Sequence, residues 1–239
     1  MRSLRVYCDL AEPVIYHGDG MAFDGILSAA VFRDMSGHER SKLPLATRDE
    51  PWLHDMELPL ARWACEYRGK CDDRLRDSNG NVWGWRASSV HAEWACETRV
   101  EVRKRAPVDE LKRWSDASDI NVSAGRYKAH DLKLAARLAR RLEWYAVGDG
   151  ERIERLLTQH ITAVGRKVGH GNGRVLRWRV EDWPHDWSVV RGSELTRAMP
   201  AGFARGYLSR RAVRAPSWHP SRIIDCVAPD DDNLRPRAA

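Results

Sequence analysis

The chain has 239 residues, of which 43% are hydrophobic, 31% are charged and eleven are tryptophans. A chain of this length can bury a core, and its richness in large apolar side chains excludes a disordered protein. Five cysteines without a Cys-x-x-Cys pair argue against a secreted disulfide framework and favour reduced thiols. Since no signal-like or bilayer-length apolar stretch is present, we expect a cytoplasmic protein with no membrane partner.

The net charge of +6 is distributed unevenly along the chain. Between Glu97 and Val180 there are 19 basic and 11 acidic residues, a surplus of +8 that leaves −2 for the rest. A regional surplus of positive charge is typical of a surface that binds a nucleic-acid backbone, because each neutralised phosphate releases counterions and strengthens binding. An ordinary solvated surface of charged residues would have the same composition.

The first elements are predicted to be a strand, a loop and a helix. Apolar and polar residues alternate from Leu4 to Leu10, which is the period of a half-buried strand. Apolar residues over 26–31 then recur at helical spacing, with Asp24 placed as a helix cap. Residues 36–56 are polar and contain several turn formers, which predicts an inserted arm.

The middle of the chain is predicted to be mainly extended. Asn79-Gly80 favours a tight hairpin turn between two strands, and residues 98–102 alternate as a strand would. Residues 107–114 have proline in the first turn of a short predicted helix. The run 133–144 suits either a helix or a strand, and its final alternation favours a strand over 141–147.

A helix, a basic glycine loop and a strand are predicted to follow. Asp149 can cap a helix whose apolar stripe runs from Ile153 to Val164, about four turns. The loop covers 165–173, and the next strand covers 175–180. Near the C-terminus, residues 187–190 and 222–227 are short strand candidates, followed by a frayed Asp- and Pro-rich end.

This loop carries the most specific chemistry in the sequence. Its glycines are Gly165, Gly169, Gly171 and Gly173, and the interleaved basic residues are Arg166, Lys167, His170 and Arg174. Glycines permit positive φ angles that bring backbone N–H groups within reach of an anion. The basic side chains can bond phosphate oxygens and stack on bases. The position between a helix and a strand disfavours nucleotide-triphosphate and dinucleotide loops, whereas a glycine-rich turn with incidental charge remains an alternative.

The loop resembles the glycine-rich loop that follows the last helix of the RRM-like domain in the RAMP proteins of CRISPR systems. Other segments resemble the fifth Cas family as it occurs in type IV systems. These segments are Phe23–Val31, Ala124–His130, Trp144–Asp149, Pro216–His219 and Cys226–Pro229. The resemblance therefore spans most of the chain.

The resemblance implies an α+β fold with an RRM-like, or ferredoxin-like, βαβ core and an antiparallel sheet. An N-terminal RRM-like half, 1–120, would contain the inserted arm. A C-terminal half, 121–239, would carry the glycine-rich loop and form a second, reduced RRM-like or β-rich unit. The two halves can also form one compact unit.

By the same resemblance, the protein is expected to be a non-catalytic subunit of a type IV effector complex. It would hold the 5′ handle of the CRISPR RNA and cap the backbone filament beside the large subunit, with target DNA nearby. Loop residues 165–174 would hold handle phosphates, with Arg126 and Lys128 as helpers and no cofactor. Base pairing would supply sequence choice, so the protein would recognise shape and backbone only.

The sequence leaves four other interpretations, of the whole protein or of single residues. Related RAMP proteins cut repeat RNA without metal, and His17, or the group Tyr127, Lys128 and His130, could supply the general acid and base. A free-standing RNA-binding protein would share the loop but not the family-like segments. A zinc site built from Cys65, Cys71, His91 and Cys96 matches no common ligand spacing. Finally, Arg86 was considered as an RNA contact.

Overall fold

The computed structural model describes residues 1–15, 20–36, 56–105, 112–113 and 128–229. Its two α-helices are α1 (Phe23–Ser36) and α3 (Gly150–His160). The longer strands are β1 (Arg2–Leu10), β4 (Trp94–Lys104), β5 (His130–Ala139), β6 (Arg141–Gly148) and β7 (Val175–Asp182). The shorter strands are β2 (Arg62–Cys65), β3 (Val82–Trp85), β8 (Val190–Arg191), β9 (Glu194–Leu195), β10 (Met199–Pro200), β11 (Leu208–Ala212) and β12 (Ile223–Val227). Three 3-10 turns are η3 (Asp73–Leu75), η5 (Val168–His170) and η6 (Pro220–Arg222).

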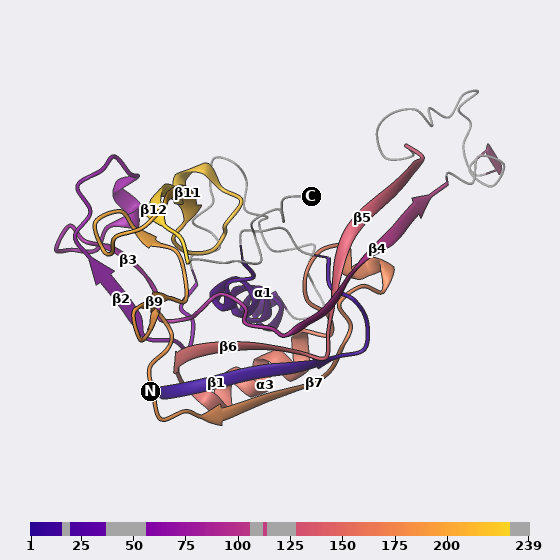
Figure 1. Cartoon of the computed structure of the whole chain (residues 1–239), viewed down its shortest axis with the longest axis horizontal. Helices are drawn as coiled ribbons and strands as arrows, with labels where there is room; N and C mark the ends of the chain where they lie inside the picture. Colours follow the sequence, from indigo (N-terminus) through magenta and orange to yellow (C-terminus); the bar gives the residue numbers. More distant parts are fainter. Residues whose placement is uncertain (16–19, 37–55, 106–111, 114–127, 230–239) are drawn as a thin grey trace.

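The central sheet has three antiparallel strands in the order β6-β1-β7 (Figure 1). Val6 of β1 lies opposite Trp144 of β6 and Val180 of β7, so these residues share the inner face. Arg5 and Tyr7 point to the opposite, outer face because side chains alternate along a strand. The strands predicted over 4–10, 141–147 and 175–180 are confirmed.

The free edge of β6 pairs with an irregular segment, residues 86–91. The Ser88 N–H donates to the carbonyl of Tyr145, and His91 and Glu143 exchange two backbone hydrogen bonds, all at 2.8 Å. This segment therefore extends the sheet without forming a regular strand.

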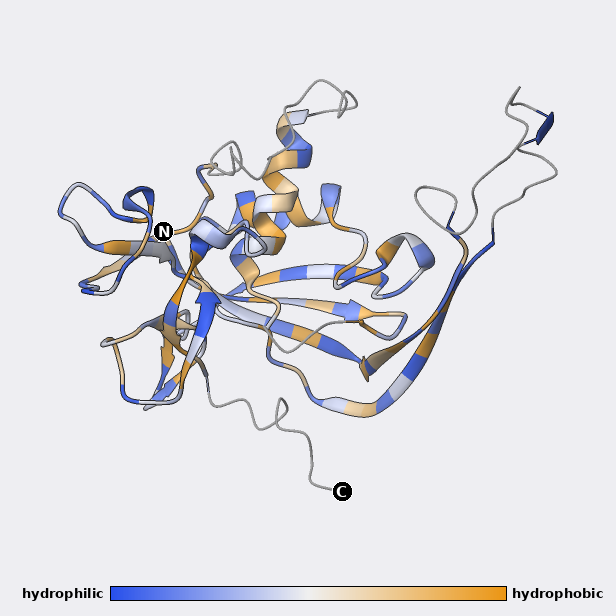
Figure 2. Ribbon diagram, turned by 90° about the horizontal axis from the view of Figure 1, so that it is seen from above, coloured by the Kyte–Doolittle hydropathy of each residue, from blue (hydrophilic) through white to orange (hydrophobic). Residues whose placement is uncertain are grey.

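Both helices cover the inner face of the sheet (Figure 2). Phe23 and Leu27 of α1 pack with Ile153 and Leu157 of α3 in the same buried cluster as the apolar residues of β1. The Asp149 carboxylate accepts a hydrogen bond from the Arg152 N–H at 3.2 Å, which confirms the predicted cap. The helix ends at His160, earlier than predicted, because the chain turns there into the glycine loop.

Asp24 corrects a prediction made from the sequence. Since α1 begins at Phe23, Asp24 lies inside the first helical turn and does not cap it. Its side chain is only 1% exposed, and its carboxylate lies 3.7 Å from the guanidinium of Arg197. Burial raises the pKa of Asp24, although Arg197 acts in the opposite direction. A tertiary contact therefore determines the position of this residue.

β4 and β5 form a two-stranded arm that projects from the rest of the molecule (Figure 1). Val100 lies opposite Leu134, whereas Glu101 lies opposite Lys133, so the two faces of the arm differ in polarity. The strand predicted over 98–102 is confirmed. Most of the arm predicted over 36–56 and of the helix predicted over 107–114 lies outside the described residues.

A second, smaller lobe surrounds its own apolar cluster. The pair β2-β3 and the sheet β10-β12-β11 contribute Trp63, Val82, Met199 and Ile224 to this cluster. Arg214 is buried in the lobe, where its guanidinium donates to the carbonyl of Trp83 at 3.0 Å and lies 3.9 Å from that indole.

The local predictions for this lobe had mixed outcomes. The Asn79-Gly80 turn is present, since the Gly80 N–H donates to the carbonyl of Asp77 at 3.0 Å, but it joins η3 to β3 and does not form the predicted tight hairpin between two strands. The strand predicted over 222–227 is confirmed as β12. The strand predicted over 187–190 is wrong for its first three residues, because the Asp186 side chain accepts the Ser188 N–H and forms a turn.

The predicted α+β class with antiparallel sheets is confirmed. Every strand pair among the described residues is antiparallel, and β1 lies between two strands from the second half of the chain. The domain boundary between 120 and 121 stays a prediction. In the described parts of the chain, no helix is long and apolar enough to cross a membrane.

Candidate nucleic-acid interface

The glycine-rich loop leaves the end of α3 and enters β7, as predicted. Four of its residues have left-handed backbone conformations: Gly165, Lys167, Gly171 and Gly173, with φ angles of 90°, 55°, 88° and 65°. Such angles are inexpensive for glycine and uncommon for other residues. The loop therefore doubles back sharply around the single turn η5.

Two glycines are required for close backbone contacts. A Cβ atom on Gly173 would lie 1.9 Å from the carbonyl oxygen of Val164, and one on Gly165 would lie 2.8 Å from that of Ile15. The Arg166 N–H also donates to the Ile15 carbonyl at 2.7 Å. The segment after β1 therefore anchors the loop. By contrast, a Cβ atom on Gly169 would meet nothing within 4 Å.

The outer part of the loop is available to a ligand. Residues 165–171 and Arg174 are exposed, whereas Asn172 is buried and donates to the carbonyl of Lys167 at 3.3 Å. Within the described chain, the N–H groups of Lys167, Val168 and Gly169 have no hydrogen-bond acceptor. Successive free N–H groups beside cationic side chains form a concave site suited to an anion.

The loop opens onto a groove of about 1740 Å³. The groove runs past one side of α1, residues 89–95, the start of β6, and strands β9 and β11. Its described lining is strongly basic. The lining arginines are Arg33, Arg140, Arg141, Arg166, Arg191, Arg197, Arg210, Arg211 and Arg214, and the carboxylates are Asp24, Glu93, Glu143 and Glu194.

Three of the lining arginines are free to bind a ligand. Arg140, Arg166 and Arg210 are exposed and have neither an ion-pair partner nor an adjacent aromatic ring among the described residues, whereas exposed Arg191 lies 4.5 Å from the Trp187 ring. They come from the β5–β6 junction, the glycine loop and β11, respectively. Others serve the fold: buried Arg197 donates to the carbonyls of Ala87 and Val213 at 2.8 and 2.7 Å. The groove thus combines fixed structural arginines with uncommitted ones.

The outer face of the central sheet is a second surface rich in arginine, but its charges are paired. Asp9 accepts hydrogen bonds from Arg141 at 2.9 Å and from Arg177. Burial alone would raise the pKa of Asp9, but the hydrogen bonds from both arginines lower it below its ordinary value. Arg5 pairs in the same way with Glu143.

Aromatic side chains cover the remainder of this outer face. The Tyr145 ring lies 5.7 Å from Trp183 and 4.9 Å from Trp187, and Tyr7 donates to Glu181 at 2.7 Å. Both tyrosines are buried. In an RRM, aromatic side chains on the sheet stack on RNA bases, which requires their exposure. The two tyrosines are therefore not available for base stacking in the present structure, whereas Trp183 and Trp187 are half-buried.

The comparison with protein families decides the identity of the chain. The profile of the family described as CRISPR type IV associated protein Csf3 matches residues 2–228. The chain belongs to the Csf3 family. Membership indicates a subunit of a type IV CRISPR complex, so the resemblance to type IV RAMP proteins is confirmed.

Other comparisons add little to this assignment. No curated protein matches this Csf3-family chain. One solved structure, described as the type III-B Cmr-beta bound to cognate target RNA, contains a similar chain. The similarity covers 94% of this chain and 84% of that one, with 8% sequence identity and a TM-score of 0.37. A likeness of this size is too weak to assign either fold or function.

Several site residues predicted for the Csf3-family chain are not brought together with the loop. His17, Arg126 and Tyr127 lie outside the described residues. His130 pairs with Lys104 at the distal end of the arm, and Lys128 precedes it. Arg137, at the base of the arm, bonds to Val14 near the loop. Seven residues of strand separate His130 from that base, which is about 23 Å.

Two further alternatives, a zinc site that the ligand spacing disfavoured and an RNA contact by Arg86, can be compared with the structure. The zinc candidates Cys65, Cys71, His91 and Cys96 form no cluster, since no group of three potential metal ligands occurs within the described residues. Arg86 forms an ion pair with Asp186, so an RNA contact by this residue stays a prediction.

Arg140 and Arg210, two of the three uncommitted arginines of the groove, were not predicted from the sequence. Neither residue belongs to a recognisable motif, and they lie 70 residues apart in the chain. Only the folded chain places them on one surface. Asn172 was also missed, although its position among the loop glycines was a possible signal for an internal brace.

Proposed function

We propose that this Csf3-family protein is the RNA-binding subunit that holds the 5′ handle of the CRISPR RNA in a type IV effector complex. The observation that carries this proposal is the exposed basic glycine loop at the mouth of an arginine-lined groove. The groove presents charge from three distant parts of the chain. This arrangement suits an extended polyanion better than a compact anion.

The chemistry of the groove supports recognition of the RNA backbone. Free N–H groups of Lys167, Val168 and Gly169, together with Arg166, can bond phosphate oxygens without reading bases. Arg140 and Arg210 extend the positive surface to either side. Since the guide pairs with its target by Watson–Crick rules, a subunit that grips only the backbone accepts any guide sequence.

We also propose that the core of the protein has an RRM-like fold. We assign the order β1-α1-β6-α3-β7, with segment 86–91 beside β6, to an RRM-like core. Because the tyrosines of the outer sheet face are buried and its arginines are paired, the RNA would follow the loop and groove. The projecting arm would contact the neighbouring backbone or large subunit, and target DNA would lie nearby.

No specific observation favours the nuclease alternative. His17 and Tyr127 lie outside the described residues, and Lys128 and His130 lie at the distal end of the arm. The protein is therefore proposed to bind RNA without cutting it, and cleavage is scored in the same experiment.

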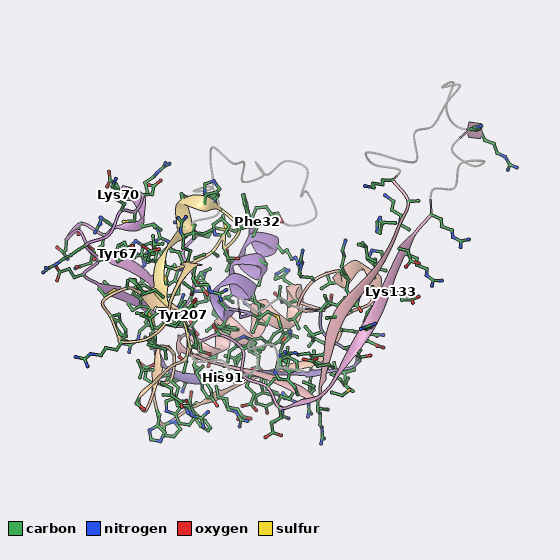
Figure 3. The ribbon with its side chains drawn as sticks, turned by 45° about the horizontal axis from the view of Figure 1, so that its top comes forward. Phe32, Tyr67, Lys70, His91, Lys133 and Tyr207 are labelled. Atoms are coloured by element: carbon green, nitrogen blue, oxygen red, sulfur yellow. The ribbon has the colours of Figure 1, made fainter. Side chains whose placement is uncertain are left out.

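The test is binding of labelled CRISPR repeat RNA in EDTA over a range of salt concentrations. The double variant Arg166→Ala/Lys167→Ala should weaken binding about tenfold or more and lower the salt slope by roughly 1 to 1.5. The control, Arg68→Ala/Lys70→Ala, removes the same charge from residues outside the groove, on the smaller lobe (Figure 3). It should leave both quantities unchanged.

Two outcomes would contradict the proposal. Equal losses in both double variants would show that net charge, and not the loop, determines binding. Specific metal-independent cleavage that is lost in His17→Ala would favour the nuclease instead.

A further inference from the structure

One loop of the smaller lobe exposes three large apolar side chains to solvent. Phe203 is 41% exposed, Tyr207 is 86% exposed and Leu208 is 58% exposed, and all three lie in or beside the connection between β10 and β11. Single exposed apolar residues are common, but a cluster of them marks an interaction surface. No contact within the described chain explains the position of Tyr207.

The backbone of this loop is held by specific contacts. A Cβ atom on Gly206 would lie 2.5 Å from Cγ1 of Val227, so the loop packs closely on β12 at this point. Gly202 has a φ angle of 97°, and the Phe203 N–H donates to the carbonyl of Pro200 at 3.1 Å. The fold therefore presents Tyr207 outward from a defined turn.

Tyr207 is not itself a lining residue of the groove, but strand register brings it next to one. Leu208 lies opposite Val227, so the preceding Tyr207 lies across from Ala228, which lines the groove. Arg210, one of the uncommitted arginines, follows on the same strand and also lines the groove. Figure 3 shows Tyr207 in the smaller lobe, away from Lys133 on the arm.

The composition of this segment indicates the chemistry of its partner. Residues 198–214 contain four arginines and no carboxylate, and the aromatic residues are interleaved with them. An exposed aromatic ring beside guanidinium groups suits single-stranded nucleic acid, since every base has a π-face and every linkage carries a charge. An apolar protein surface would leave the arginines unpaired.

We propose that Tyr207 is a stacking platform for an unpaired base of the RNA whose phosphates are held by Arg166 and Arg210. Phe203 and Leu208 form the apolar border of this platform. The inference rests on the proposed function and adds to it a second subsite, at the opposite side of the groove from the glycine loop. Stacking of this kind tolerates any base, which agrees with a subunit that selects no sequence.

The experiment uses synthetic single-stranded RNA of the repeat-derived 5′ handle, with 2-aminopurine substituted at one position at a time. Stacking on an aromatic ring quenches 2-aminopurine fluorescence, so at least one position should be quenched when the wild-type chain binds. Tyr207→Ala should remove this quenching and weaken binding about tenfold. Tyr207→Phe keeps the ring and should retain both. Leu176→Ala, at an exposed apolar residue that does not line the groove, is the control.

The outcomes separate this inference from the proposed function. If Arg166→Ala/Lys167→Ala loses RNA binding while Tyr207→Ala keeps both the quenching and the affinity, the stacking role of Tyr207 is wrong. The proposed function would still hold in that case. Unchanged RNA binding in Tyr207→Ala with failure to assemble with the other complex subunits would identify a protein-binding surface and also overturn the stacking role. Because Tyr207 is largely exposed, its variants should melt at the wild-type temperature, and thermal unfolding checks this.

Discussion

The outer sheet face and the groove contain similar residues but use them differently. On the outer face, Arg5 and Arg177 are bonded to carboxylates, as is Arg141 where this face borders the groove, and the two tyrosines are buried. In the groove, Arg140, Arg166 and Arg210 are exposed without partners among the described residues. The two regions are therefore distinguished by whether their charged groups are paired, and not by their arginine and aromatic content.

Neighbouring residues show this difference most clearly. Arg140 and Arg141 are adjacent in the chain, yet Arg141 bonds to Asp9 and lies 4.1 Å from the Tyr7 ring, while Arg140 is uncommitted. The β5–β6 junction separates their directions. One arginine stabilises the sheet, and the other is available to a ligand.

The largest effect is expected for the glycines that shape the loop. Gly173→Ala would place a Cβ atom 1.9 Å from a backbone oxygen at a φ angle of 65°, so the backbone must move. We expect a loss of about 3 kcal/mol or more in the free energy of unfolding. Gly169→Ala has open space and should change stability by less than about 0.5 kcal/mol. Urea denaturation measures both, and equal effects would contradict the rigid loop.

A smaller effect separates the two arginine-rich surfaces. Arg5→Ala removes a half-buried ion pair and contacts with the Tyr7 and Trp183 rings, so we expect a loss of about 1 kcal/mol and of about 3 °C in Tm. RNA affinity should be unchanged. Arg140→Ala should leave Tm unchanged and weaken RNA binding about fivefold. The comparison fails if Arg5→Ala weakens RNA binding as much as Arg140→Ala does.

The smallest effect concerns pH, and it has opposite signs at two buried carboxyls. The pKa of Asp9 is lower in the folded protein than in the unfolded chain, so its hydrogen bonds with Arg141 and Arg177 stabilise the fold at pH values above the unfolded-state pKa. This stabilisation is lost as the pH falls through the folded-state pKa. The pKa of Asp24 is higher in the folded protein than in the unfolded chain, where it is about 4. The free energy of unfolding therefore falls as the pH rises from the unfolded-state pKa through the folded-state pKa of this residue.

The pH dependence of stability is measured as the urea midpoint of the wild type and of each variant between about pH 3 and pH 7. Relative to the wild type, Asp9→Asn should become less stable as pH rises, because it lacks a carboxylate that gains favourable bonds. Asp24→Asn should become relatively more stable over the same range, because it cannot acquire the buried charge. Parallel pH profiles for both variants and the wild type would disprove the assigned environments.

Local patterns in the sequence predicted much of the central fold. The alternation in β1, the apolar stripe of α3 and its Asp149 cap depend on residues close in the chain, and each is present. Asp24 failed as a predicted cap because its position depends on Arg197, far along the chain. The projecting arm was missed because no short turn connects the long strands β4 and β5.

The candidate site could be predicted only in part, for the same reason. The loop was visible because its four glycines and basic residues are contiguous in the sequence. The groove was not, because Arg140 and Arg210 acquire a role only when β6 and β11 border one surface. Nor could the sequence show that Tyr7 and Tyr145 would be buried, or that Trp183 and Trp187 would pack on Tyr145.

The most direct test of the account is photo-crosslinking of 4-thiouridine-labelled CRISPR repeat RNA to the protein, with mass spectrometry of the modified peptides. We expect crosslinks to residues 165–174 and to the segments around Arg140 and Arg210. The outer-face residues Tyr7, Arg177 and Trp183 should remain unmodified. Crosslinks confined to these outer-face residues would contradict the central claim, because the RNA would then lie on the sheet and not in the groove.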